Sequence, residues 1–206
     1  EGRLYPFGGA CNRYYNIRCR LKFDVEALNL VRVGEKLTFG ASVRVGGSVE
    51  PVAVRRTVGM NKSFLVNALY PFYAAFFNGI GHGVVLPEQP SKQGMDQRNA
   101  AFCYPAELAH GFFHALLSQN SLPDALVLPH VRSIPVENGL PSAQVCPFVQ
   151  GEPFYLKSAF SAAHHELKKN RSLVVYSPFL DMEKGLAAAR SPMMSMARQL
   201  GASRQQ

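Results

Sequence analysis

Apolar and polar positions follow two different patterns along this chain, and the change comes near residue 50. Residues 17–23 alternate as in a β-strand, and residues 27–33 and 37–45 follow as two further short strands. Gly46 and Gly47 form a natural turn after them. We therefore expect residues 1–50 to be a small β-rich N-terminal segment.

From residue 51 onward, short apolar runs alternate with segments of helical spacing. Strands that are separated by helices become parallel neighbours, because each connection must cross over the sheet. We expect residues 51–206 to form an α/β domain of Rossmann-like or flavodoxin-like type. It would have a mainly parallel sheet of about four or five strands with helices on both faces. The predicted strands are residues 52–60, 82–87, 125–129, 144–150 and 173–178. The predicted helices are residues 64–77, a helix that opens at Cys103, and residues 154–169 and 181–200.

Length and composition agree with one globular module. The 206 residues are 47% hydrophobic and 17% charged, which is ordinary for a protein with a packed core. No apolar run approaches the roughly 18 to 20 residues of a membrane span, and no series of residues forms a signal peptide. Because the first residue is Glu1, we expect a soluble module excised from a longer polypeptide, with no membrane partner.

The net charge is +8, and its excess lies in the first third of the chain. A basic face attracts nucleic acid, the phosphates of coenzyme A or an acidic protein. These charges are scattered and form no block of like charge, so a solvated surface is the simpler interpretation and nucleic acid is an unlikely partner.

Four cysteines lie far apart, and no pair has the Cys-x-x-Cys spacing of a zinc site. This spread does not resemble a secreted disulfide framework, so we expect a reducing cytoplasm. The four residues are Cys11, Cys19, Cys103 and Cys146.

The chain also lacks a Walker phosphate loop, a GxGxxG loop, a G-x-S-x-G elbow and an H-E-x-x-H motif. ATP hydrolysis and serine hydrolase chemistry therefore have no support.

Cys103 stands directly before a helix that Pro105 opens. Unpaired N–H groups at a helix N-terminus favour a thiolate, which is the form of cysteine that binds metal or attacks an electrophile. The alternative is a small buried thiol, since free cysteine is among the most buried residue types. The helix itself is predicted by one apolar face, made of Leu108, Phe112, Ala115 and Leu116.

Histidines offer weaker candidates. His110 and His114 lie one helical turn apart, yet Phe112 and Phe113 between them favour ordinary packing over a shared metal. His130 ends the strand predicted at residues 125–129, and ligands in parallel sheets bind beyond such ends.

Three cysteine motifs carry a resemblance to a known family. They are residues 102–111 (FCYPAELAHG), 146–153 (CPFVQGEP) and 6–12 (PFGGACN). Together they resemble the acyl-CoA dehydratase activase-related family, in the 2-hydroxyglutaryl-CoA dehydratase activator and component group. The resemblance covers about residues 5–160, including the strand, apolar helix and Gly-Val-Val strand of residues 58–86.

This resemblance implies a cytoplasmic iron–sulfur module of anaerobic metabolism. It implies a [4Fe–4S] cluster bound by Cys103, Cys146 and Cys11, which supports low-potential electron transfer. The implied partners are an adjoining ATPase activase domain or an acyl-CoA dehydratase component, with a CoA thioester as the small molecule. The chain departs from the family in lacking ATPase motifs, and its three matching cysteines leave the fourth iron ligand to come from elsewhere.

Two hypotheses follow. In the first, the chain is the redox module just described, with Cys103 and Cys146 on the same edge of the sheet. Cys11 would reach this edge on a loop in which Gly8 and Gly9 allow close approach of the backbone. In the second, it is a cluster-free structural or interaction domain whose cysteines are inert. No complete catalytic motif decides whether the chain is an enzyme.

Overall fold

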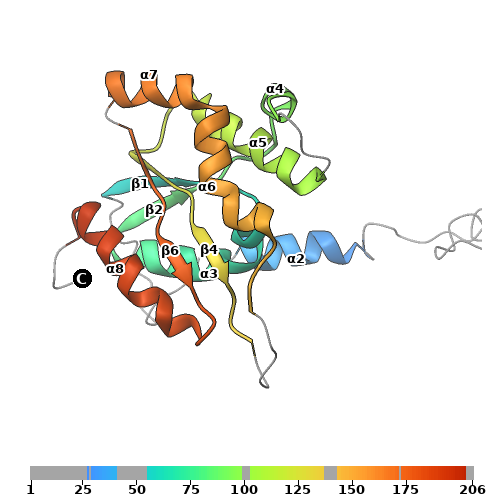
Figure 1. The fold of residues 1–206 in the computed structure, drawn as a ribbon, viewed down its shortest axis with the longest axis vertical. Helices are drawn as coiled ribbons and strands as arrows, with labels where there is room; N and C mark the ends of the chain where they lie inside the picture. The colour runs from blue at the N-terminus through green and yellow to red at the C-terminus, as the bar shows by residue number, and fades with distance from the viewer. Residues whose placement is uncertain are drawn as a thin grey trace, which may run out of the picture. The chain divides into compact units, whose positions relative to one another are not determined.

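The structure is a computed structural model that describes residues 27, 29–40, 55–98, 103–136, 143–171 and 173–202. The chain divides into two units, Glu1–Gly40 and Ala41–Gln206. In the first unit the described element is helix α2 (Leu30–Phe39), in which no residue is buried. The second unit carries the sheets and the remaining described helices (Figure 1).

The main sheet is four-stranded, with the order β2-β1-β3-β5, and every pair in it is parallel. This confirms the predicted α/β fold with a parallel sheet. The strand β1 is central, because it pairs with β2 on one side and with β3 on the other. The four strands are β1 (Arg56–Met60), β2 (His82–Val85), β3 (Ala125–Val127) and β5 (Val174–Tyr176).

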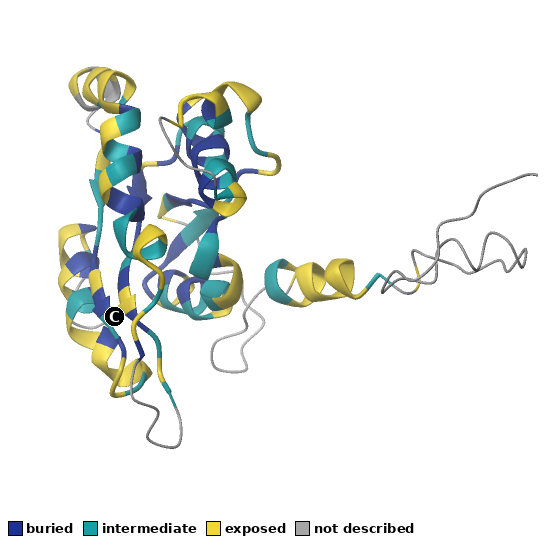
Figure 2. Cartoon of the chain, turned by 45° about the vertical axis from the view of Figure 1, so that its right-hand side comes forward, coloured by how far each residue is buried: buried dark blue, intermediate teal, exposed yellow. Residues whose placement is uncertain are grey.

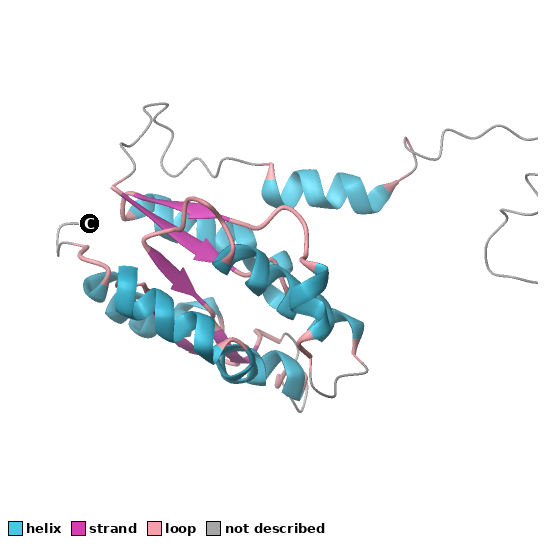
Figure 3. Cartoon of the chain, turned by 90° about the horizontal axis from the view of Figure 1, so that it is seen from above, coloured by secondary structure: helices cyan, strands magenta, loops and turns pink. Residues whose placement is uncertain are grey.

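Helices flank the strands on both sides, as seen from above in Figure 3. Alternate residues of β3 point to opposite faces, so Ala125 and Val127 join one core cluster while Leu126 joins another. The first cluster includes residues of α3 and α8, and the second includes residues of α5 and α6. Figure 2 shows that burial concentrates on the strands and on the helix faces next to them. These helices are α3 (Phe64–Gly79), α5 (Tyr104–Leu117), α6 (Pro147–Ala159) and α8 (Arg190–Gln199).

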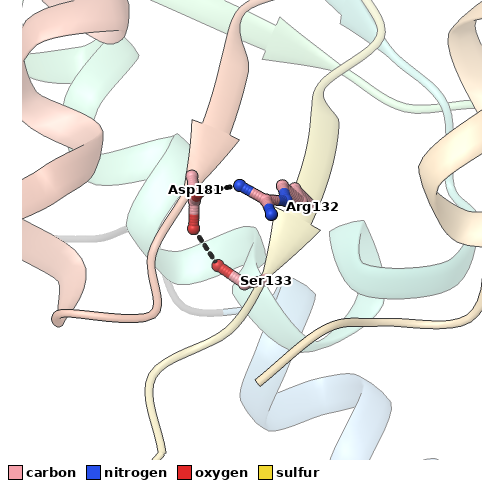
Figure 4. Close-up of polar contacts among 3 residues, drawn as sticks. All are labelled: Arg132, Ser133 and Asp181. Carbon is pink, nitrogen blue, oxygen red and sulfur yellow. Dashed lines mark hydrogen bonds and ion pairs between the residues drawn. The ribbon is translucent and has the colours of Figure 1, made fainter. Parts of the chain in front are cut away.

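A second, two-stranded parallel sheet pairs β4 (His130–Ser133) with β6 (Phe179–Asp181). Asp181 joins the two strands, because it accepts hydrogen bonds from the Ser133 hydroxyl and, at 2.8 Å, from Arg132 (Figure 4). The Ser133 bond is the largest cause of the lowered pKa of Asp181, and the charge of Arg132 acts in the same direction. His130 is thus the first residue of strand β4. The sequence predicted instead that His130 ends the strand of residues 125–129.

Helix α4 (Lys92–Asp96) packs closely on α5, and two glycines make this approach possible. A Cβ on Gly111 would lie 2.7 Å from Met95 Cγ and 2.8 Å from Pro90 Cβ. A Cβ on Gly94 would meet the Cβ of His114 and, at 2.7 Å, the carbonyl oxygen of His110. The sequence analysis predicted no helix or strand at residues 92–96.

The predicted strands at residues 27–33 and 37–45 are wrong where the structure describes them. Residues Leu30–Phe39 form a helix, whose N-cap Asn29 accepts a hydrogen bond from the backbone N–H of Arg32. The helix follows from the three- and four-residue spacing of Leu30, Val33 and Leu37, which outweighs the β-propensity of the valines. The rest of the predicted β-rich segment lies outside the described residues.

The strand predicted at residues 144–150 is also wrong. Only Gln144 forms a bridge, to Ser133, and α6 begins at Pro147. Proline lacks the N–H that a strand ladder needs, whereas the first turn of a helix leaves that group unpaired anyway. The helix predicted at residues 154–169 is two helices, α6 and α7 (Ser161–Arg171), which meet at Phe160.

The helix predicted at residues 181–200 starts too early. Its first part is the end of β6, a turn at Gly185 with a φ of 106°, and the 3-10 helix η1 (Leu186–Ala189). The α-helix begins only at Arg190. A φ in this range suits glycine, which explains where the helical path is interrupted.

The contact between α4 and α5 gives a stability prediction. We expect Gly111→Ala to lower the free energy of unfolding by about 1 to 2 kcal/mol, because the new methyl group overlaps Met95 and Pro90. Gly79→Ala is the matched control, since a Cβ at that position would meet nothing within 4 Å, and it should be neutral or stabilising. Urea unfolding of both variants measures the difference, and equal effects would contradict the close packing.

Candidate functional site

The candidate site lies where the strand order of the main sheet reverses. After β1 the chain passes through α3 to β2 on one side, and after β2 it returns to β3 on the other side of β1. Ligands in open α/β sheets bind at such a switch point, outside the carboxyl ends of the strands. The segment that leaves β1 here carries Asn61 and Ser63, which are both buried.

Two of the predicted ligand residues begin helices. Cys103 is the N-cap of α5 and Cys146 is the N-cap of α6, and each helix has a proline in its first turn. Both cysteines are free, with Cys103 partly exposed and Cys146 exposed. The predicted helix start at Cys103 is therefore confirmed. Unpaired N–H groups at both positions favour bound negative charge.

Both cysteines influence the hydroxyl group of Tyr155. Burial is the main cause that raises the pKa of its hydroxyl, and the negative charges of Glu152, Cys103 and Cys146 raise it further. Because such effects weaken with distance, two helix starts that are far apart in sequence lie near one tyrosine. The use of Cys103 and Cys146 as metal ligands stays a prediction.

The third predicted ligand, Cys11, lies outside the described residues. Within the described ranges, no group of three or more His, Cys, Asp and Glu residues is placed to hold a metal ion. The two cysteines at the helix starts could thus supply two ligands of a larger set.

Glu152 is the residue of this site that the sequence did not single out. It lies on α6 with only 4% of its surface exposed. Its Oε1 accepts a hydrogen bond of 2.9 Å from Asn61 Nδ2 and another from the Ser63 hydroxyl. Asn61 Nδ2 also donates to the carbonyl oxygen of Ala109 at 3.1 Å. The carboxyl group thereby links the end of β1 to α6, and Asn61 extends the link to α5.

Burial raises the pKa of Glu152 to about 7, against the lowering effect of its bonds from Ser63 and Asn61. The charge of Glu152 in turn adds to the effect of burial in raising the pKa of Tyr73, on α3. The site therefore contains a carboxyl group that exchanges its proton near neutral pH, which is the property that proton-transfer chemistry requires.

Ser63 departs from the usual behaviour of a helix N-cap. Its side chain makes no capping hydrogen bond to α3, and its hydroxyl donates to Glu152. The next residue, Phe64, has a φ of 38°, which is strained for a residue with a side chain. Strain of this kind concentrates at functional sites, where the surrounding structure holds it in place.

The histidines take packing roles. His110 Nδ1 lies 2.8 Å from the carbonyl oxygen of Ala106, and its ring stacks on Tyr155 with centroids 5.1 Å apart. His114 packs against Phe160. His130 makes edge contacts with aromatic rings at residues 154 and 179, and burial lowers its pKa.

A sequence signal for Glu152 did exist. Once Pro147 is taken as a helix start, Glu152, Leu156 and Phe160 recur every four residues and share one buried face. A carboxylate on the apolar face of a helix requires a partner, and that requirement points to a site. The strand predicted over residues 144–150 concealed this periodicity.

The raised pKa of Glu152 predicts a pH dependence of stability. In the unfolded chain its pKa is the ordinary 4.5, whereas in the folded protein it is about 7. Between these values the folded protein binds the extra proton, so its stability falls as pH rises. We expect this group to remove up to about 3 kcal/mol over that interval. The Glu152→Gln variant should lack this decline when urea unfolding is followed over the same pH range; parallel profiles for the two proteins would contradict the assignment.

Comparison with known proteins identifies a family. No curated protein and no solved structure matches the chain. None of the helices in the described ranges has the length and apolar character needed to span a bilayer. The family model described as CoA enzyme activase uncharacterised domain (DUF2229) matches residues 57–206. This range contains the main sheet except Arg56, the first residue of β1, together with Glu152, Cys103 and Cys146. The chain belongs to the CoA enzyme activase uncharacterised domain family.

Proposed function

We propose that this chain is an iron–sulfur module of a CoA enzyme activase or acyl-CoA dehydratase-related protein. Cys103, Cys146 and Cys11 would bind a [4Fe–4S] cluster. The observation that carries the proposal is the pair of free cysteines at two helix starts, both of which act electrostatically on Tyr155. Free thiolates are the usual ligands of such clusters.

The residues present fit this group in chemistry and charge. An iron–sulfur cluster with its thiolates is negatively charged, and the N-termini of α5 and α6 present N–H groups to that charge. When bound, the cluster supplies one-electron transfer at low potential. Cys103 and Cys146 would hold it at the starts of α5 and α6.

The surroundings of the two cysteines support a partner at this edge. Tyr104, directly after Cys103, is 61% exposed, and Phe148, two residues after Cys146, is 38% exposed. Exposed aromatic side chains are typical of surfaces that meet another protein. The proposed partners are an adjoining ATPase activase domain or a dehydratase component, with a CoA thioester as the small molecule, in a reducing compartment such as the cytoplasm.

The second candidate is a cluster-free interaction domain of the same parent protein. One observation favours it: the described ranges contain no third metal-ligating side chain beside the two cysteines. In this case Glu152, Asn61 and Ser63 serve only to fix α6 against the end of β1.

Iron content separates these two candidates. We expect the anaerobically purified protein to contain iron and sulfide, and Cys103→Ser and Cys146→Ser each to reduce both by more than half, because each variant removes a thiolate ligand. Cys11→Ser should have the same effect, while Cys19→Ser, outside the proposed ligand set, should leave the iron content unchanged. Metal and sulfide analysis with thermal unfolding of each variant provides the measurement.

The outcomes are distinct. Equal iron loss in the Cys11 and Cys19 variants would indicate general destabilisation of the N-terminal segment. A Cys11 variant with its full iron content would remove the third ligand from the proposal. Wild-type protein without iron or sulfide after anaerobic preparation would favour the interaction domain.

A further inference from the structure

Three buried polar atoms near Glu152 have no hydrogen-bond partner among the described residues. They are the side-chain carbonyl oxygen of Asn61 and the hydroxyl groups of Tyr73 and Tyr155. Asn61 bonds directly to Glu152, and the charge of Glu152 raises the pKa of both tyrosines, so all three lie near this carboxyl group. Buried polar groups almost always have a hydrogen-bond partner. A buried water molecule that makes three or four hydrogen bonds commonly serves as that partner.

Tyr155 extends this polar cluster toward the cysteines. The pKa of its hydroxyl is raised by the charge of Glu152 and also by those of Cys103 and Cys146. A phenol can donate one hydrogen bond and accept another, so it can stand between a water and a negatively charged group. The ring is held by its stacking on His110, which fixes the direction of the hydroxyl.

The other titratable groups near the cluster are accounted for. His110 directs Nδ1 to the carbonyl oxygen of Ala106, and Lys157 on α6 donates to Ser177 at 2.8 Å. Lys62 stands between Asn61 and Ser63 in the segment after β1. Burial and the bonds from Asn61 and Ser63 are the causes of the Glu152 shift, and no positive charge is among them. Glu152 is thus the carboxyl group that can compensate added negative charge by taking up a proton.

We propose that Asn61, Tyr73 and Tyr155 hold an internal water beside Glu152, and that Glu152 takes up a proton through this water when negative charge is added at Cys103 and Cys146. In the working protein the added charge is one electron from a low-potential one-electron donor, so in this respect the inference rests on the proposed function. One electron arrives at the group that the cysteines hold, and one proton from solvent forms the O–H bond of Glu152. Reoxidation returns both.

The direct test adds charge without any metal. In metal-free protein carrying Cys11→Ser and Cys19→Ser, the remaining cysteines are alkylated with iodoacetate, which adds a carboxylate, or with iodoacetamide, which adds a neutral group of similar size. Carbon-13 NMR of glutamate-labelled protein then follows the titration of Glu152, and Glu152→Gln assigns its signal. We expect the midpoint of the iodoacetate-treated protein to be higher by about half a pH unit or more, because charges interact strongly through the protein interior.

Tyr155→Phe provides the matched control for the bridge. It keeps the ring that stacks on His110 and removes only the hydroxyl, so it should reduce the difference between the two alkylated forms to less than half. Equal midpoints in the two alkylated forms of the protein with Tyr155 intact would overturn the inference, whether or not the Tyr155 variant folds.

A potentiometric titration separates this inference from the proposed function. In anaerobically loaded protein the midpoint potential should fall as pH rises around neutrality, with about 59 mV per pH unit as the upper limit for one electron with one proton. Glu152→Gln should make it nearly independent of pH in the same range. Protein that binds no iron would reject the proposed function. The alkylation experiment alone would then decide whether Glu152 takes up a proton when negative charge is added. Bound iron with identical slopes in both proteins would reject the proton uptake by Glu152.

Discussion

The hydrogen bonds to the buried carboxyl group of Glu152 are the constraint on which the arrangement of the candidate site depends. This site forms one edge of the domain. A carboxyl group with so little exposure requires partners, and Asn61 and Ser63 at the end of the central strand provide them. Strain lies next to these bonds, since Phe64 adopts a positive φ, and Ser63 makes no side-chain cap on α3. The bonds from Asn61 and Ser63 fix helix α6 in position, and with it the helix start at Cys146.

The frame and the edge of this domain are built in different ways. The frame consists of parallel strands between two apolar clusters, and side chains such as Val58, Leu126 and Val127 hold it together by burial alone. The edge consists of polar and ionisable groups whose positions depend on hydrogen bonds and on helix termini. A family defined over residues 57–206 contains both parts, which is consistent with a fold that serves to position one edge.

The sequence predicted the frame well and the edge only in part. Apolar runs located β1, β2, β3 and β5, because a buried parallel strand is nearly continuous in hydrophobic residues. A proline in the first turn marks both cysteine-bearing helices, but only Pro105 predicts its helix clearly. At Pro147, the neighbouring Val145 and Val149 make the segment resemble a strand. The role of Glu152 could not be found from spacing alone, since its partners come from residues about 90 positions earlier that only the folded sheet brings near.

The order of the strands has a consequence for how this chain reaches its native state. The central strand β1 acquires its second neighbour only when residues 125–127 are available, and the sheet is complete only with residues 174–176. Pairings between such distant segments slow folding, because loop closure must precede the stabilising contacts. During synthesis the first half of the domain therefore exposes an unpaired edge of β1 for some time, and a nascent chain in this state is a natural client for chaperones.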